Sequence, residues 1–399
     1  MRTPLCFLAL LLPLLSFTAA SDGALDQAKK IAHRYPLIDG HIDVPYRLQE
    51  KWDDVTKATT RGDFDYPRAM AGGLSAPFMS IYTPADSEGK NATALADILI
   101  DQVEAIVYRA PDKFAVTRSS NEIRKNFNDH KISLLLGMEN GAPLAGSFDN
   151  LNHFYERGVR YITLAHGKSN HIADSSYDEV RIWKGLSPFG VQLVAEMNRL
   201  GIMIDIAHVS DDAFYEVLQR SKVPVIASHS SLRHFTPGME RNVSDDMLKA
   251  LAKNGGVLMI NFGSYFLTDA AHQYSSVRDK AETGFKKLHG DQPSDAAQKK
   301  FDDEYRAKFP YPFASVNDVA NHIDHAVKLV GADHVGFGSD FDGVGDSLPV
   351  GLKSPADFPN LIAELLRRGY NETDIAKIMS GNVLRVMEAV EKFSASSKK

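Results

Sequence analysis

The chain has 399 residues, of which 44% are hydrophobic and 24% are charged, a composition typical of an ordinary globular protein. This length is enough for one large domain or two smaller ones. The formal net charge of -6 is modest and the basic residues form no concentrated patch, which argues against nucleic acid or an anionic membrane surface as a partner.

The N-terminal segment has the pattern of a cleaved secretory signal. Arg2 precedes an apolar stretch over residues 4–17, which is followed by the small residues TAA. The stretch is shorter than the roughly 20 residues that span a bilayer, so a membrane anchor is the weaker interpretation. We therefore predict a signal peptide over residues 1–20 and an exported protein, periplasmic or secreted, with no stable membrane insertion. The only cysteine, Cys6, would leave with that segment.

Eight short apolar segments follow along the chain, bounded by glycine, proline or polar residues. They are mostly continuous rather than alternating in hydrophobicity, which is typical of parallel strands covered on both faces. We predict strands at 36–43, 76–83, 132–140, 159–166, 201–209, 224–230, 256–262 and 334–340. Strand followed by helix, eight times over, predicts a single (β/α)8 barrel spanning residues 21–399. An open doubly wound sheet is the alternative fold.

Helix-length stretches with charged faces separate these strands. We predict helices at 93–109, 188–200, 210–220 and 244–253. The last two open with the letters SDD, where a serine hydroxyl can cap free amides and the carboxylates favour the positive end of the helix dipole. Residues 268–313 form a long polar insertion with predicted helices, which either shapes the active face or is a solvated hairpin.

Five metal-binding side chains fall at the ends of predicted strands. His41 and Asp43 are two positions apart and therefore share one strand face. Three other predicted strands each end near one such residue: Glu139, His208 and His229. Each residue alone could equally be a hydrogen-bonded polar group of the core. Together in one barrel mouth they would be costly to bury without a cation. Five ligands exceed the usual set for one zinc, so we infer two divalent ions that share Glu139.

Further polar residues end the remaining strands. Asp340 and Asp342 are expected to share a strand face, and Asp340 could move a proton between water and a leaving group; a plain turn or a calcium-like acidic loop is the alternative. His166 could polarise a substrate oxygen. Arg241 could hold a substrate carboxylate, although an ordinary surface arginine would have the same pattern.

The sequence around these residues resembles the membrane dipeptidase (renal dipeptidase) family of binuclear zinc peptidases. The matching stretches are DGHID, GMEN, YITLAH, GLSPFGVQLVAEMNRLGIMIDIAHVS, PVIASHSS, RNVSDDML, HVGFGSDFDGV and SGNVLRV. They follow one another in order over nearly the whole predicted mature chain. The resemblance implies that His41 and Asp43 bind one zinc ion, that His208 and His229 bind the other, and that Glu139 bridges them.

The resemblance also assigns the other site residues. Asp340 matches the catalytic acid/base and acts beside the bridging Glu139, while His166 and Arg241 match substrate-binding positions. Tyr265 matches an aromatic residue near the substrate, although the spacing of the sequence around it differs from that of the family. Asn140 stands where many relatives have glycine, which would alter the pocket beside the bridge.

The expected activity is therefore hydrolysis of dipeptides, including those with a C-terminal D-residue, by a hydroxide that bridges two zinc ions. One alternative is a hydrolase of the same metal chemistry that acts on another amide or ester, such as an N-acyl amino acid, a β-lactam, a lactone or a phosphoester. A second is a non-catalytic metal-binding or solute-binding protein. The family also suggests a possible homodimer, although no patch in this sequence indicates one.

Overall fold

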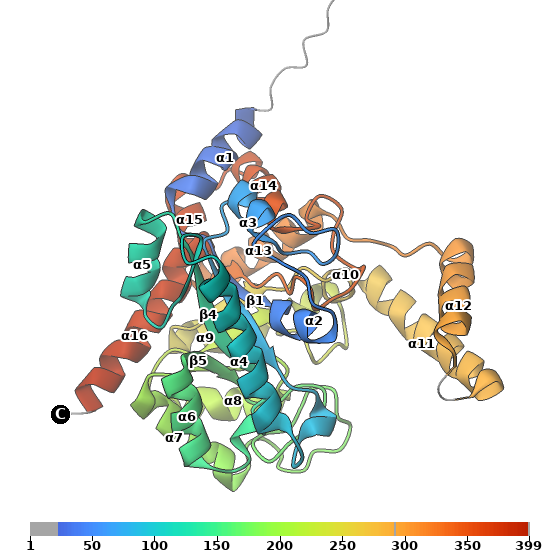
Figure 1. Cartoon of the computed structure of the whole chain (residues 1–399), viewed down its shortest axis with the longest axis horizontal. Coiled ribbons are helices and arrows are strands. Elements are labelled where there is room, and N and C mark those ends of the chain that lie inside the picture. The colour runs from blue at the N-terminus through green and yellow to red at the C-terminus, as the bar shows by residue number, and fades with distance from the viewer. Residues whose placement is uncertain (1–22, 291–292, 398–399) are drawn as a thin grey trace, which may run out of the picture.

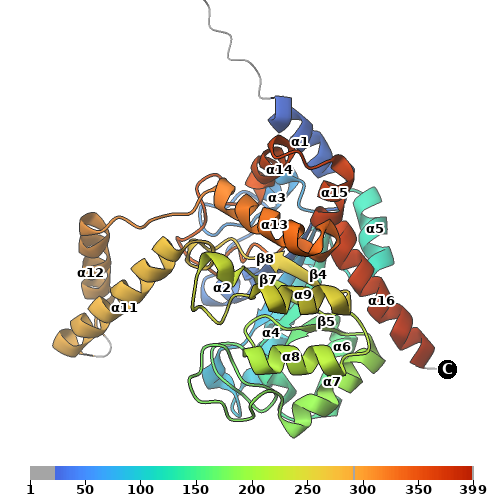
Figure 2. The same cartoon turned by 180° about the vertical axis from the view of Figure 1, so that it is seen from behind.

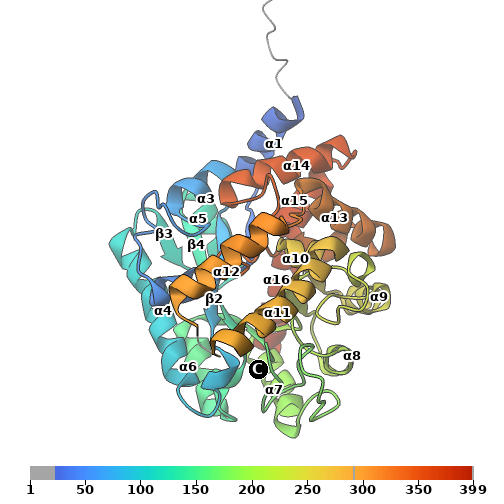
Figure 3. The same cartoon turned by 90° about the vertical axis from the view of Figure 1, so that its right-hand side faces the viewer.

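The computed structural model describes residues 23–290 and 293–397. Eight parallel strands form a closed barrel: β1 (Ile38–Ile42), β2 (Ala76–Tyr82), β4 (Ile132–Glu139), β5 (Val159–Thr163), β6 (Met203–Asp205), β7 (Ile226–Ser230), β8 (Val257–Ile260) and β9 (Val335–Phe337). The barrel closes because β1 pairs with both β2 and β9, and β2 also pairs with β4. The predicted (β/α)8 fold is thus confirmed, and the open-sheet alternative is wrong. Figure 3 shows the helices arranged as a ring around the strands.

A ninth strand, β3 (Phe114–Val116), was not predicted. It pairs with the first residues of β4 outside the barrel order. The described α-helices are α1 (Gly23–Arg34), α2 (Val44–Glu50), α3 (Tyr66–Gly72), α4 (Ala92–Arg109), α5 (Ser120–Asn128), α6 (Phe148–Arg157), α7 (Pro188–Leu200), α8 (Asp211–Arg220), α9 (Asp245–Asn254), α10 (Ser264–Leu267), α11 (Asp269–His289), α12 (Asp295–Lys308), α13 (Val316–Val330), α14 (Phe358–Arg367), α15 (Glu372–Ala376) and α16 (Asn382–Ser397).

Two apolar cores hold the barrel. The larger packs the outer faces of the strands against the surrounding helices. The smaller joins alternate strand residues, such as Phe78, Tyr161 and Met259, to the apolar face of α16, with Val386 and Met387 among the contacts. Because the two faces of each strand are buried, the strands are apolar throughout, as their sequences indicated. Polar side chains are left for the carboxyl ends of the strands.

The serine caps predicted for two helices are present. The Ser210 hydroxyl accepts a hydrogen bond from the Ala213 amide at the start of α8, and the Ser244 hydroxyl accepts one from the Met247 amide at the start of α9. These caps fix where each helix begins after the loop that follows β6 or β7. The loops in turn carry residues of the candidate site.

The insertion at 268–313 forms the helices α11 and α12, which project from one end of the barrel as a hairpin (Figures 1 and 2). In α11 only Ala271 is fully buried, so the hairpin contributes little to the core. Its predicted helices are confirmed. Tyr265, Tyr274 and Tyr311 line a hollow at its base that adjoins the barrel mouth.

The predicted signal peptide, residues 1–20, lies outside the described part of the chain. Within residues 23–290 and 293–397, no helix combines the length and the apolar character needed to cross a bilayer.

Candidate active site

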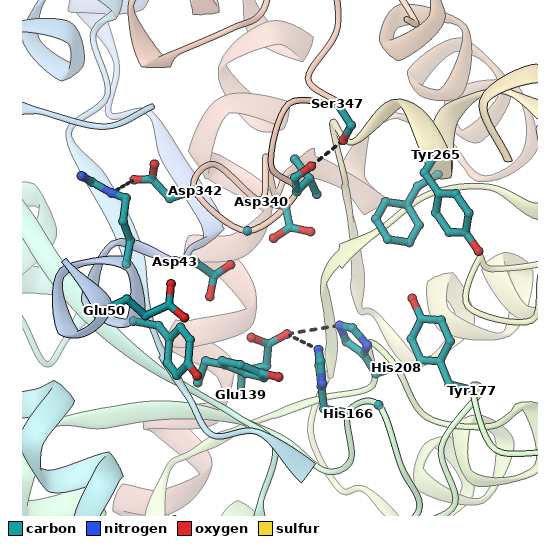
Figure 4. Close-up of a pocket in the computed structure, with 17 residues that line it drawn as sticks. Asp43, Glu50, Glu139, His166, Tyr177, His208, Tyr265, Asp340, Asp342 and Ser347 are labelled. Carbon is teal, nitrogen blue, oxygen red and sulfur yellow. Dashed lines mark hydrogen bonds and ion pairs between the residues drawn. The ribbon is translucent and has the colours of Figure 1, made fainter. Parts of the chain in front are cut away.

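The strand ends converge on one carboxylate at the barrel mouth. Oε1 of Glu139 lies 3.2 Å from Nε2 of His208 and 3.4 Å from Nε2 of both His166 and His229. Its other oxygen, Oε2, lies 3.3 Å from Nε2 of His41. Four imidazoles, each at or just after the end of a different strand, therefore face a single buried carboxylate. Figure 4 shows this carboxylate, Glu139, with two of the four, His166 and His208. The sequence prediction that these residues meet is supported by this geometry.

Asp43 completes the group on the β1 side. Its Oδ2 lies 3.4 Å from Nε2 of His41, and both side chains lie within one cluster of potential metal ligands with Asp340. The rings of His41 and His229 stack with their centroids 3.8 Å apart. Glu139 belongs to two clusters of potential ligands, one with His41 and His229 and one with His166 and His208. His41 links the first of these to Asp43.

The chemistry of these side chains fits divalent cations. Nε2 of His41 is buried without a hydrogen-bond partner, and Nε2 of His208 lies only 2.7 Å from Nε2 of His229. Burial lowers the pKa of both His208 and His229 well below the usual range, so these rings are neutral and carry lone pairs. Lone pairs that face each other and a carboxylate repel unless a cation lies among them. The arrangement is a metal-binding cluster.

Glu139 remains anionic within this cluster. Burial alone would raise its pKa, but the adjacent histidines, His41 foremost, outweigh burial and hold the pKa well below the usual value. An anionic carboxylate with its two oxygens directed at different imidazoles can bind two cations at once. Ser80 also donates a hydrogen bond to Oε2, at 3.1 Å, which fixes the carboxylate plane.

Left-handed backbone conformations place several site residues. Asn140, His208 and Asp340 have φ values of 72°, 67° and 64°, which non-glycine residues rarely adopt. Each lies where a strand turns into its loop, and the Asp340 amide donates to the His41 carbonyl at 3.0 Å. Such strain is maintained only where surrounding contacts require it, and it is common at functional sites.

Asp340 has the surroundings of a proton carrier. Its Oδ2 accepts a hydrogen bond from Nδ2 of Asn261 at 2.7 Å. Burial, followed by the nearby carboxylate of Asp43, raises the pKa of Asp340 to about 8. A carboxyl group in that range can both give and take a proton near neutral pH. The predicted acid/base position is consistent with this environment.

Glycine beside the two aspartates is required by the space available. A Cβ on Gly343 would lie 2.1 Å from Oδ2 of Asp43 and 2.2 Å from Oδ1 of Asp340. Any side chain at this position must therefore displace one of the carboxylates. The close backbone approach that the glycine-rich sequence indicated is present.

Arg241 is buried, so the interpretation as an ordinary surface arginine is wrong. Its Nη1 donates to the Ser230 hydroxyl and its Nη2 donates to the His229 carbonyl, both at 2.5 Å. Nη2 also lies 3.0 Å from Nε2 of His208. The guanidinium therefore lies behind His208, and its Nε has no hydrogen-bond partner.

A cavity of about 770 Å³ opens above the cluster. Six of the predicted site residues line it: Asp43, Glu139, His166, His208, Tyr265 and Asp340. Tyr82, Tyr177 and Phe266 add aromatic walls that the sequence did not single out. Figure 4 shows Tyr177 and Tyr265 on the side of the cavity opposite Asp43. The cavity is large enough for a small substrate with one face on the metal cluster.

Sequence reasoning missed the hydrogen bonds that orient the histidines. The Tyr161 hydroxyl lies 2.7 Å from Nδ1 of His41, and the Ser228 hydroxyl lies 2.7 Å from Nδ1 of His229. Ser228 in turn donates to Asp205 at 2.7 Å. Such outer partners fix the ring orientation and the tautomer of a ligand histidine. The only available signal was a polar residue within an apolar strand.

All eight strands are shorter than predicted, and the difference at the last one changes the position of Asp342. Strand β6 ends at Asp205 rather than residue 209, and β9 ends at Phe337 rather than residue 340. Asp342 has a φ of 67°, so the expected shared strand face with Asp340 is wrong. Its Oδ2 instead pairs with Nε of Arg47 at 3.1 Å, as Figure 4 shows.

Comparison with known proteins assigns the chain to a family. The model of the membrane dipeptidase family (Peptidase family M19) matches residues 25–399. The chain belongs to this family. It is therefore a dipeptidase of the M19 metallopeptidases, with peptides as its substrates and with the clusters of metal-binding residues described above.

Individual relatives agree with this assignment. Dipeptidase verJ of Clonostachys rogersoniana is 35% identical over 97% of this chain and 92% of its own length. Dipeptidase 3 of Mus musculus is 32% identical over 93% of this chain and 68% of its own. The crystal structure of the probable dipeptidase PvdM from Pseudomonas aeruginosa matches with a TM-score of 0.82 and 26% identity, covering 94% of this chain and 100% of that one. The resemblance inferred from the sequence motifs is confirmed.

Proposed function

We propose that this dipeptidase uses two zinc ions held around Glu139. The observation that carries this proposal is the position of Glu139, whose two oxygens face different imidazoles at 3.2–3.4 Å. His41 and Asp43 would hold one ion, and His208 and His229 the other. When bound, the ions supply a bridging hydroxide as the nucleophile and stabilise the negative charge that develops on the scissile carbonyl oxygen.

The side chains of the chain itself perform the remaining steps. Asp340, held by Asn261, takes the proton released at the nucleophile and gives it to the leaving amine. His166 borders the cavity with a partly exposed side chain and donates a hydrogen bond to a substrate oxygen. Tyr265 forms part of the opposite wall and packs against the substrate side chain.

Arg241 provides the positive charge for the free carboxylate of the dipeptide. Its present partners are a hydroxyl, a carbonyl oxygen and Nε2 of His208, so no acidic group neutralises the guanidinium among its hydrogen-bond partners. A substrate carboxylate at the cavity floor would interact with this charge through a low-dielectric environment. We expect dipeptides with a free C-terminus to be preferred over blocked ones for this reason.

The cavity also bears on substrate range. Its volume of about 770 Å³ exceeds what a dipeptide needs, which supports tolerance of a C-terminal D-residue. Other amides and esters, such as N-acyl amino acids, β-lactams or lactones, are the second candidate substrates. The same metal chemistry would cleave them, so only a substrate comparison separates the two.

Assays of the purified protein test these proposals together. Zinc content is measured per chain, and hydrolysis is compared for L,L-dipeptides, L,D-dipeptides and N-acyl amino acids. We expect two zinc ions bound around Glu139 and the fastest turnover on dipeptides. His208→Ala should lose one ion and nearly all activity, whereas His33→Ala, at an exposed position, should lose neither. Full activity of His208→Ala with one ion or none would contradict the two-ion mechanism.

We also propose export and a homodimer. Export rests on the N-terminal sequence pattern alone, and cell fractionation together with N-terminal sequencing of the mature protein tests it. Sedimentation of the purified protein measures its oligomeric state. A single species of twice the chain mass would support the dimer, and a monomer over the whole concentration range would contradict it.

A further inference from the structure

A second cluster of metal-binding side chains lies away from the barrel mouth. It consists of His234 from the 3-10 turn η3 (Arg233–Phe235), Asp245 from the first turn of α9, and His325 from α13. One ligand atom from each residue lies within 4.8 Å of the other two. We propose that these three side chains form an additional site for a divalent transition-metal ion of the zinc type.

The geometry of the cluster suits such an ion. Nε2 of His325 lies 2.8 Å from Oδ1 of Asp245, and the rings of His234 and His325 stack with centroids 4.1 Å apart and planes inclined by 22°. His41 and His229, which face Glu139, stack in nearly the same way, at 3.8 Å and 26°. Two imidazoles and one carboxylate are a common donor set of zinc, with water completing the coordination.

The donors differ in how firmly they are held. Asp245 is the first residue of α9, whose start is fixed by the Ser244 cap. His325 lies on α13 one turn after the fully buried His322, and its side chain is 21% exposed. Only His234 is on an exposed turn. Two donors are therefore placed in advance, and the ion needs to order just one more side chain, which limits the entropy lost on binding.

Charges around the cluster do not oppose a cation. Arg233, the residue before His234, donates two hydrogen bonds to the carboxylate of Asp211, at 2.7 and 2.6 Å. This bidentate pair neutralises the neighbouring positive charge. Asp245 is then left to balance part of the charge of a bound ion.

An ion at this position would connect the loop between β7 and α9 to α13. The same loop already has one such connection, because the Leu232 amide donates to Nδ1 of His322 at 3.1 Å. Arg241, which contacts His208, lies further along this loop. We therefore assign the ion a structural role: it stabilises the loop that carries Arg241, while none of its three ligands lines the cavity or belongs to the clusters around Glu139.

Zinc titration of the full chain tests the proposal. The protein is first saturated with zinc around Glu139, and further zinc is added in competition with a coloured chelator. We expect the wild-type chain to bind one more ion than His234→Ala or His325→Ala, and its melting temperature to rise with zinc above that of either variant. Loss of a ligand should weaken binding by more than the roughly 10- to 100-fold caused by loss of an outer partner.

Control variants make the result specific. His33→Ala removes another exposed histidine and should bind as many ions as the wild type. Dipeptide turnover of His234→Ala and His325→Ala, measured with saturating zinc, should stay close to that of the wild type. Equal ion counts in the wild type and both variants would overturn the proposal, and so would an equal loss in His33→Ala.

Discussion

The hydroxyl of Tyr161 is predicted to prepare His41 for metal binding. It is fully buried, donates a hydrogen bond to the Gly40 carbonyl at 3.1 Å, and lies 2.7 Å from Nδ1 of His41. Because its one proton is used on Gly40, the hydroxyl accepts the proton of Nδ1–H. This tautomer leaves the lone pair of His41 on Nε2, which faces Glu139 and Asp43.

Tyr161→Phe removes this hydrogen bond while keeping the ring. The substitution leaves a buried N–H and a buried carbonyl without their partner, and one unsatisfied buried group costs about 1–3 kcal/mol. Loss of the partner of a ligand histidine typically weakens metal binding by about 10- to 100-fold, which equals about 1.4–2.7 kcal/mol. The first estimate is the expected loss of folding free energy, and the second is the expected fall in zinc affinity. Turnover at saturating zinc should be largely retained.

The assay is a titration of metal-free protein with buffered zinc, following both bound metal and dipeptide hydrolysis. Circular dichroism establishes that the variant is folded. Tyr108→Phe is the matched control, because Tyr108 is 88% exposed. A Tyr161→Phe protein that is folded and binds zinc with wild-type affinity would refute the claim that the hydroxyl sets the tautomer of His41.

Four further outcomes are expected. Removal of metal with a chelator should abolish dipeptide hydrolysis, and added zinc should restore it. Gly343→Ala should lower kcat/KM with little change in melting temperature, because its Cβ would lie within 2.2 Å of the carboxylates of Asp43 and Asp340. Arg241→Lys should raise KM about tenfold or more, since loss of a charged hydrogen bond costs roughly 1.5–3 kcal/mol. Burial lowers the pKa of His322 to about 4, from a usual 6.5, so the free energy of unfolding should fall by up to about 3 kcal/mol as the pH drops from 6.5 to 4. Denaturant titrations should show that His322→Gln lacks this part of the pH dependence.

The sequence was sufficient to predict the barrel and to expect that the proposed ligands meet at its mouth. The signal was strong because strands buried on both faces must be apolar throughout, so a histidine or carboxylate at the end of such a run is conspicuous. His41, Glu139 and His229 were all found in this way, and the two histidines meet at the carboxylate of Glu139. The helix starts at Ser210 and Ser244 were predictable from local capping chemistry.

Features that depend on contacts between distant segments were not predictable. The partner of His41 comes from a residue 120 positions away, and Asn261 reaches Asp340 across 79 positions. The sequence near each residue does not indicate which distant residue it will contact. Asp342 was misplaced because an alternating pattern was extended past Phe337, where left-handed backbone conformations end the strand.

The strained backbone and the buried polar side chains at the barrel mouth both cost folding free energy, and the rest of the fold offsets this cost. Left-handed conformations at His208 and Asp340 cost folding free energy, and so does burial of the Glu139 carboxylate. The two cores have no need of these residues, since α16 and the outer helices already cover the strands. The fold therefore supplies the stability that holds the ligands in place before a cation arrives. Such preorganisation is what a metal site requires, because ligands that are already oriented lose little entropy on binding.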